Sequence, residues 1–294
     1  MKSRVTNAMK KIPEIKFNKE SKEQTDGFEL IVLEDFIARI QNPVGHNPFR
    51  THRLNFFMIL IITDGEVHHS IDFKTHHLQA GDAMVISKGQ IHAFDEHSNY
   101  KGYMLLFTQE FMQKYIAKST MERINNLYNY FLGQKKINNA EQNDDFVRSL
   151  HYEIERKSPS SPNIMGALLS LYLLKINDKD EQLEHPSHSR KLDYFNQFRL
   201  LVEKNFSKTR NAKVYASDLS ISYKFLNEVS KATVRSTAKS FIDNYVILEA
   251  KRMLITTAFS VKEIAYSLGF DEVTNFTKFF KKHTATTPLE FRKI

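Results

Sequence analysis

The chain has 294 residues, of which 41% are hydrophobic and 26% charged, enough to bury a sizeable core and to form two domains. It contains no cysteine, which excludes disulfides, thiolate metal sites and cysteine nucleophiles. No apolar run approaches the roughly 20 residues that cross a bilayer, and the opening residues, MKSRVTNAMKKIPEIKFNKE, lack the apolar core of a secretory signal. We therefore expect a soluble, cytoplasmic protein without a membrane partner.

The positive charge is concentrated in the last third of the chain. The net charge is +8, and residues 190–294 hold 19 of the 42 Lys and Arg but only 10 of the 34 Asp and Glu. That segment therefore carries +9 and residues 1–189 carry −1. A neutral part joined to a basic part is typical of an effector or interaction domain attached to a nucleic-acid binder. An anionic membrane or an acidic protein could bind the same charge.

Residues 1–107 divide into a polar arm and a series of strands. Residues 1–27 are lysine-rich without clear periodicity, so we expect a mobile arm. An apolar run ends at Ile62 and is followed by Asp64-Gly65, which predicts a hairpin. In the strand expected next, Val67, His69, Ile71 and Phe73 share one face. Further strands are predicted at Ala83–Ser87 and Tyr100–Phe107. Many short strands with regular turns indicate a small barrel or sandwich.

After Thr108 the apolar spacing becomes helical. The expected helices are Gln109–Ile116, Met121–Phe131, Asp144–Arg156 and Asn163–Lys175. The last of these is apolar over more than one stripe, so either it contacts a second subunit or it packs wholly on its own barrel; the sequence favours neither. Residues 178–189 are charged and contain Pro186, which is typical of a linker between domains.

The C-terminal region contains a pair of short helices with a tight turn. Ser260-Val-Lys-Glu263 fits the capping-box pattern that begins a helix, and Gly269 ends that helix because glycine accepts a positive φ. In the next helix Phe276, Phe279 and Phe280 share the inner face, while the opposite face is polar and basic. This pattern predicts a helix-turn-helix whose second helix enters the major groove of DNA.

A similar unit precedes it. Val214–Leu219 is the first helix and Ser222 is the expected N-cap of the second, Tyr223–Ala232. One continuous helical pattern, Ala238–Leu254, joins the two units. Both recognition helices can reach successive major-groove turns, about 34 Å apart, only if the DNA bends or the joining helix is suitably set.

From Val214 to Arg292 the sequence resembles the DNA-binding domain of AraC/XylS-type bacterial transcription regulators. The most specific segments are LEAKRML (Leu248 to Leu254), SVKEIAYSLGF (Ser260 to Phe270), NFTKFFKKH (Asn275 to His283) and TPLEFRK (Thr287 to Lys293). The resemblance implies an α+β chain with an N-terminal cupin-like β-barrel, flanking helices and an all-α DNA-binding domain with two helix-turn-helix units. The implied divisions are an arm at 1–27, an effector and dimerisation domain at 28–177 (barrel 28–107, helices 109–177), a linker at 178–189 and the DNA-binding domain at 190–294.

The resemblance also implies which side chains face DNA. Base contacts fall on Lys224, Asn227, Glu228, Val273, Thr274, Thr277 and Lys278. Asn pairs with adenine, Lys with guanine and Glu with cytosine, and the methyl groups of Thr and Val suit thymine. Lys231, Lys281 and Lys282 are interpreted as phosphate contacts. Three positions depart from the family pattern: Ser230 replaces a usual aromatic residue, and Arg235 and Ala285 stand where glycine is common.

Histidines are frequent in the barrel region, with eight between His46 and His97. Metal-binding cupins have a His-x-His pair, which is missing here: His68-His69 and His76-His77 are adjacent pairs, and only His92 falls on the matching late position. We therefore expect no metal and no cofactor. His69, His92 and Tyr103 are the candidates for an effector pocket.

These observations predict a cytoplasmic, sequence-specific regulator and not an enzyme, with double-stranded DNA, RNA polymerase, a small-molecule effector and a second copy of the chain as partners. Activation is the commoner role in the family. Two alternatives stay open: a metal-dependent cupin enzyme with a basic helical tail, and a regulator whose barrel binds no ligand and only dimerises. No P-loop, G-x-S-x-G or G-x-G-x-x-G motif supports an enzyme.

Overall fold

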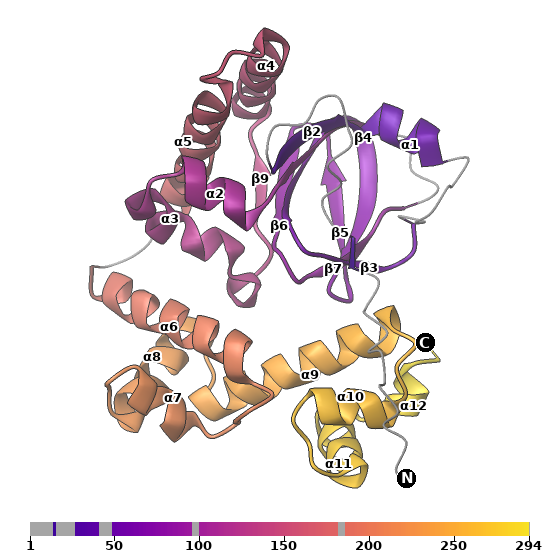
Figure 1. Cartoon of the computed structure of the whole chain (residues 1–294), viewed down its shortest axis with the longest axis vertical. Coiled ribbons are helices and arrows are strands. Elements are labelled where there is room, and N and C mark those ends of the chain that lie inside the picture. The colour runs from indigo at the N-terminus through magenta and orange to yellow at the C-terminus, as the bar shows by residue number, and fades with distance from the viewer. Residues whose placement is uncertain (1–13, 16–26, 41–48, 96–99, 182–185, 294) are drawn as a thin grey trace, which may run out of the picture.

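The computed structural model describes residues 14–15, 27–40, 49–95, 100–181 and 186–293. An N-terminal sheet domain carries helices α2 to α5 along one side, and a C-terminal helical domain lies below it (Figure 1). The predicted α+β class is confirmed. Within these residues no helix is both long and apolar enough to cross a lipid bilayer.

Among the described residues, nine strands form the N-terminal sheet. They are β1 (Glu14–Ile15), β2 (Phe28–Val32), β3 (His52–Leu54), β4 (Phe57–Ile71), β5 (Lys74–Gln79), β6 (Asp82–Ile86), β7 (Ile91–Ala93), β8 (Tyr100–Phe107) and β9 (Lys136–Asn138). The sheet runs β1-β3-β7-β4-β6-β9, with β5 and β8 also paired to β4 and β2 paired to β8. No pairing among the described strands closes this path into a ring, so the barrel is open. Most of the expected arm at 1–27 lies outside the described residues.

The hairpin predicted at Asp64-Gly65 is wrong, because β4 continues through both residues. Gly65 has φ +76, and the β4–β8 register shifts between Ile62 and Asp64, which marks a bulge. Strand β4 pairs with β8 up to Gly65 and with β5 from Glu66 onward. The glycine therefore redirects a long strand from one part of the sheet to another instead of ending it.

The hairpin turn lies eight residues further on, at Asp72-Phe73. Ile71 pairs with Lys74, and the two turn residues have φ +45 and +68, as a two-residue turn of type I′ requires. Neither is glycine, so the turn is strained, and the side chain of Asp72 supports it: Oδ1 accepts from the amide of Ile91 at 3.3 Å and Oδ2 accepts from Nε2 of Gln90 at 2.8 Å. Val67, His69 and Ile71 are buried as predicted, whereas Phe73 is exposed.

Two apolar clusters fill the sheet domain. The inner cluster includes Met58, Leu60 and Phe94 and receives Phe36 and Ile37 from α1 (Leu33–Ile40). The outer cluster joins the opposite face of β4 and β8 to the helices. Those helices are α2 (Gln109–Tyr115), α3 (Lys118–Ile124), the 3₁₀ turn η1 (Asn125–Tyr128), α4 (Ala140–Arg156) and α5 (Ser161–Glu181). The 3₁₀ turn η2 (Tyr130–Leu132) instead packs Phe131 against the C-terminal domain. Alternation along β4 thus produces two cores, one on each face.

The C-terminal domain is helical throughout its described length. It comprises α6 (Pro186–Asn205), α7 (Ala212–Asp218), α8 (Tyr223–Val234), α9 (Ala238–Thr256), α10 (Val261–Ser267), α11 (Val273–Thr284) and α12 (Pro288–Phe291). Since α5 reaches Glu181 and α6 begins at Pro186, the described parts of the expected linker at 178–189 are helical. One apolar cluster joins α6, α7, α8 and the first half of α9, and a second joins the rest of α9 to α10 and α11.

Two helices of the C-terminal domain end in left-handed residues that are not glycine. Arg235 follows α8 with φ +55, and Ala285 follows α11 with φ +63. These are the two positions where the sequence departs from a usual glycine. A Cβ makes this conformation costly, by about 1 kcal/mol per residue.

Replacing Ala285 by glycine is expected to raise the free energy of unfolding by about 1 kcal/mol, because it relieves this strain. Urea denaturation of the full chain measures the change. Ala285→Ser is the matched control and is expected to leave stability within about 0.5 kcal/mol. Equal stability of the glycine and serine variants would contradict the interpretation.

Candidate nucleic-acid interface

The second helix-turn-helix unit is built as the sequence predicted. Ser260 Oγ accepts from the amide of Glu263 at 3.2 Å, and the Glu263 carboxylate accepts from the amide of Ser260 at 2.7 Å, which completes the capping box of α10. Gly269 has φ +77, and a Cβ there would lie 1.9 Å from the Ser207 carbonyl oxygen. Phe276 and Phe280 are buried against α9 and α10. This packing fixes the orientation of α11.

The outer face of α11 is polar and accessible. Thr274, Lys278, Lys281 and Lys282 are exposed, and Val273 and Thr277 are half-buried. These are the residues expected to contact DNA from this unit. Thr274 Oγ1 donates to the Glu272 carboxylate at 3.1 Å, so its hydroxyl is partly engaged within the protein.

The first unit presents α8 in the same way, with one difference. Ser222 caps α8 by accepting from the amide of Phe225 at 3.1 Å, and Lys224, Glu228 and Lys231 are exposed. Asn227 is half-buried: its Oδ1 accepts from the amide of Ala238 at 3.0 Å and its Nδ2 donates to the Tyr223 carbonyl at 3.1 Å. Its amide group therefore links α8 to the first residue of α9.

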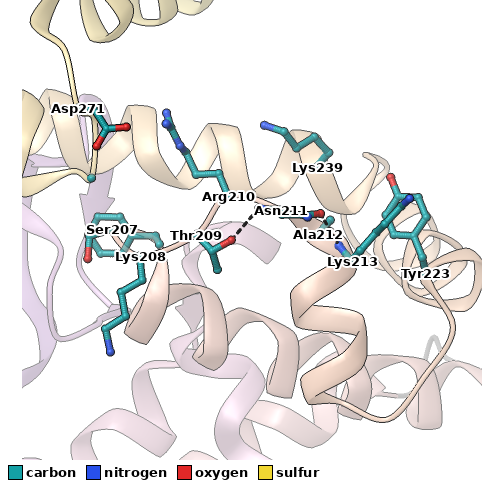
Figure 2. Close-up of a pocket in the computed structure, with 12 residues that line it drawn as sticks. Ser207, Lys208, Thr209, Arg210, Asn211, Ala212, Lys213, Tyr223, Lys239 and Asp271 are labelled. Carbon is teal, nitrogen blue, oxygen red and sulfur yellow. Dashed lines mark hydrogen bonds between the residues drawn. The ribbon is translucent and has the colours of Figure 1, made fainter.

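A groove of about 580 Å³ lies between the two units (Figure 2). It extends from Tyr223, the first residue of α8, to Gly269 and Asp271, which precede α11. Its other lining residues come mainly from the loop before α7 and include four cations, Lys208, Arg210, Lys213 and Lys239, against the single carboxylate of Asp271. In Figure 2 Arg210 and Lys239 point to the same side of the groove, whereas Lys208 points away from them.

Arg210 connects the loop to the second unit. Its guanidinium lies 3.8 Å from the ring centre of Phe270 and 5.7 Å from that of Phe279. Partial burial lowers the pKa of Arg210, while Asp243 and Asp271 act in the opposite direction. The side chain thus stacks on the turn before α11. Sequence periodicity could not single out Arg210, Lys213 or Lys239, because they come from a loop and from the first turns of two helices.

Two known protein families match separate regions of the chain. The family described as an AraC-like ligand binding domain matches residues 35–171, and the one described as a helix-turn-helix domain matches residues 215–294. The chain belongs to the AraC family of transcription regulators. Its two matched regions coincide with the sheet domain, together with its helices, and with the two helix-turn-helix units.

Individual relatives are distant. The transcriptional activator RhaR of Mannheimia succiniciproducens is 22% identical over 250 residues, which cover 83% of this chain and 87% of RhaR. The Msm operon regulatory protein of Streptococcus mutans is 23% identical over 130 residues, 44% of this chain and only about half (47%) of that relative's length. Among solved structures, ToxT of Vibrio cholerae has a TM-score of 0.48 at 16% identity, covering 91% of this chain and 98% of ToxT.

In this AraC-family chain the expected effector-pocket residues do not form one group. His69 Nε2 and His92 Nδ1 are 3.1 Å apart, and both rings pack edge-on against Phe94 in the inner core. Tyr103 lies on the other face of the sheet, where its ring contacts that of His151 at 5.4 Å. Tyr103 faces outward because alternate residues of β8 face opposite sides. Among the described residues no group of three or more His, Cys, Asp or Glu could hold a metal; His46 and His97 lie outside them.

Complete burial lowers the pKa of His69 to about 3, with smaller contributions from His52 and His76. The folded pKa lies below the unfolded value of 6.5, so the unfolded chain takes up a proton that the folded chain does not. Stability is therefore lost as the pH falls from about 6.5 toward 3, by up to about 1.4 kcal/mol per unit.

Between pH 6.5 and 5.5 the free energy of unfolding is expected to fall by about 1 kcal/mol less in the variant His69→Gln than in the wild type, because glutamine does not titrate. Chemical denaturation at both pH values gives the difference. His68→Gln, at the exposed neighbouring position, serves as control and is expected to keep the wild-type slope. A His69→Gln slope equal to that of the wild type would show that His69 does not stay neutral on folding.

Proposed function

We propose that this AraC-family regulator binds an asymmetric DNA site with both helix-turn-helix units of one chain, so that α8 and α11 occupy successive turns of the major groove. The observation that supports this proposal is the joint placement of α8 and α11. Both units pack on α9, both outer faces are accessible, and a basic groove runs between the N-terminal ends of the two helices. Recognition helices contact bases mainly through their N-terminal residues.

Within this proposal the two helices read different bases. Lys224 and Glu228 on α8, and Val273, Thr274, Thr277 and Lys278 on α11, are proposed to face base edges. Asn227 is proposed to position α8, since its amide already bonds Tyr223 and Ala238. Lys231, Lys281 and Lys282 are proposed to contact phosphates.

The groove between the units suits the DNA backbone that runs from one major-groove segment to the next. Four cationic side chains and one carboxylate give it a net positive charge. Lys239 lies in the first turn of α9, where the helix dipole disfavours a positive charge, and its partner there is Asp243. We propose that Arg210, Lys213 and Lys239 bind phosphates of this connecting backbone.

The sheet domain is proposed to influence DNA binding through a buried contact with α9. Arg252 is 1% exposed and donates from Nε and Nη2 to the two carboxylate oxygens of Asp72, at 2.8 and 2.7 Å. Its Nη1 donates to Glu249 at 2.6 Å, and Glu249 in turn accepts from Arg53 of β3. Asp72 and Arg53 belong to the sheet domain, and Arg252 and Glu249 belong to α9. Any change in the strained β4–β5 turn therefore reaches the helix that carries both units.

The remaining partners are proposed on narrower grounds. Tyr152 of α4 and Leu171 of α5 are 66% and 52% exposed, so this helical face is a candidate homodimer contact. Activation through RNA polymerase, a small-molecule effector and a cytoplasmic location are proposed from the AraC family. RhaR is named a transcriptional activator and the Msm protein an operon regulatory protein, and we propose that this chain likewise regulates transcription and catalyses no reaction.

Selection of DNA from a random-sequence pool by the full chain at physiological salt tests the proposal. We expect one enriched motif with two unequal half-sites about 10 base pairs apart. Binding to the enriched DNA no tighter than to random DNA would reject sequence-specific regulation.

Lysines on the DNA-facing surface are expected to fall into two kinds. Lys278→Ala should weaken binding to the selected site by about 1–3 kcal/mol and relax the preference at one position. Lys281→Ala and Lys213→Ala should weaken binding to all DNA sequences alike. Each should also reduce, by about 1, the steepness with which the logarithm of the binding constant falls with the logarithm of the salt concentration. Competition titrations on the selected and single-base-changed sites separate these effects. If Lys278→Ala weakened binding to every DNA sequence equally, Lys278 would not be a base contact.

Asp72→Asn should loosen the two domains, because it removes the bidentate carboxylate partner of the buried Arg252 and leaves only Glu249 of the same helix, a loss of up to about 3–5 kcal/mol. Asparagine tolerates the left-handed turn, so the hairpin itself should persist. We expect faster amide exchange in α9 and an altered affinity for the selected DNA. Asp64→Asn is the control: its exposed pair with Lys101, 3.4 Å apart, should matter by less than about 1 kcal/mol. Identical exchange in both variants would contradict coupling through Asp72.

A further inference from the structure

The basic groove lies where the proposed complex brings a minor groove of DNA against the protein. This groove of about 580 Å³ runs from Tyr223, at the start of α8, to Gly269 and Asp271, just before α11. In the proposed complex α8 and α11 occupy major-groove segments about one helical turn apart on one face of the duplex. Because the two grooves of DNA alternate along each face, the minor groove faces the protein between those segments. We call the base pairs there, which neither helix reaches, the spacer.

The positive charge of the basic groove comes from separate parts of the chain. Lys208, Arg210 and Lys213 belong to the loop before α7 and to its first turn, and Lys239 belongs to the first turn of α9. The single carboxylate in the lining is that of Asp271. In Figure 2 Arg210 and Lys239 point to one side of the groove, while Lys208 points away from them. One side of the groove therefore combines a guanidinium and an ammonium group.

Arg210 is held in place by the protein itself. Its guanidinium lies 3.8 Å from the ring centre of Phe270 and 5.7 Å from that of Phe279. The side chain is half-buried, unlike the exposed lysines of the groove. Stacking on a ring uses the face of the guanidinium and leaves its N–H edge for acceptors. Little conformational freedom is therefore lost when this group meets DNA.

Carboxylates next to these cations shorten the reach of their charge. Lys239 pairs with Asp243, one turn along α9. Partial burial lowers the pKa of Arg210, and the carboxylates of Asp243 and Asp271 counter that effect. A cation beside a carboxylate attracts phosphate weakly from a distance, because the two fields partly cancel. Strong attraction then requires close approach to a concentrated negative potential.

A narrow minor groove supplies such a potential. Runs of A·T pairs narrow the minor groove and strengthen its negative potential, which attracts arginine. A G·C pair adds the 2-amino group of guanine to that groove. Arginine is more weakly hydrated than lysine, so it gives up less when it approaches the DNA.

We infer that the basic groove selects the spacer by the width of its minor groove, and that the protein therefore prefers A·T pairs at positions that neither α8 nor α11 contacts. Arg210 determines this preference, Lys239 supports it, and Lys213 binds phosphate whatever the spacer sequence. The preference rests on the proposed function, since it requires both recognition helices on one face of one duplex. It adds a third source of specificity to the two half-sites.

Binding of the full chain to duplexes that differ only in the spacer tests this preference. Both half-sites come from the DNA selected above, and the spacer consists of A·T pairs, of G·C pairs or of inosine·C pairs. Inosine lacks the 2-amino group of guanine in the minor groove but keeps its major-groove acceptors. In anisotropy titrations at physiological salt, we expect about tenfold tighter binding to the A·T spacer than to the G·C spacer, and the inosine spacer should restore most of that difference.

Substitutions in the basic groove identify the residue responsible. Arg210→Lys keeps the charge but loses the planar stack, and it should reduce the preference for the A·T spacer from about tenfold to about threefold or less. Lys213→Ala is the matched control and should weaken binding to all three spacers by the same factor. Lys208→Ala, which removes a cation that points away from Arg210, should leave the preference unchanged. If Arg210→Lys no longer binds the selected half-sites, Lys239→Gln replaces it and should reduce the preference in part.

Equal affinity for the A·T and G·C spacers would overturn the inference. An inosine spacer that behaves like the G·C spacer would also overturn it, because the discrimination would then lie in the major groove. An unchanged preference in Arg210→Lys, or in its replacement, would show that the basic groove is not the source. If no DNA sequence is selected, the proposed function and this preference both fall, whereas selected half-sites with an indifferent spacer would reject the preference alone.

Discussion

A buried guanidinium constrains the arrangement of the whole molecule. Arg252 is buried where α9 contacts the sheet domain, and its charge is matched by Asp72 from the sheet domain and by Glu249 one turn away on α9. Tyr130 covers the group at 4.8 Å. Because an unpaired charge in such a place is strongly unfavourable, the domains cannot separate or slide without first hydrating Arg252. The relative position of the domains thus depends on this bidentate pair, together with the ion pair between Arg53 of β3 and Glu249 of α9.

Helix α9 connects this contact to the DNA-binding surface, because both helix-turn-helix units pack on it. Its first half belongs to the core of one helix-turn-helix unit and its second half to the core of the other, so its length sets the separation of α8 and α11. The loop before α7 connects the units a second time, through Arg210 on Phe270 and through the close approach of Ser207 to Gly269. Helix α6 packs in the same core as α7 and α8.

Local signals made much of the C-terminal domain predictable. The capping box at Ser260, the left-handed Gly269 and the apolar face of α11 depend on neighbours within a few residues, and all three are confirmed. The turn at Asp72-Phe73 could not be predicted, because its strain is offset by hydrogen bonds from Gln90 and Ile91, which lie far along the chain. The stronger local signal, Asp64-Gly65, predicted a turn where the strand forms a bulge instead. Pairs such as Asp72 with Arg252, 180 residues apart, have no local signature. For the same reason the basic groove is visible only in the folded structure.

In the proposed complex, one chain presents both recognition helices to one face of DNA at a fixed separation. Hydroxyl-radical footprinting of the full chain on its selected DNA tests this arrangement directly. We expect two protected windows on the same face, about one helical turn apart, with protection of the connecting backbone that weakens in Lys213→Ala. A single protected window, or two whose spacing varies freely between bound sequences, would contradict a rigid α9 joining the two units.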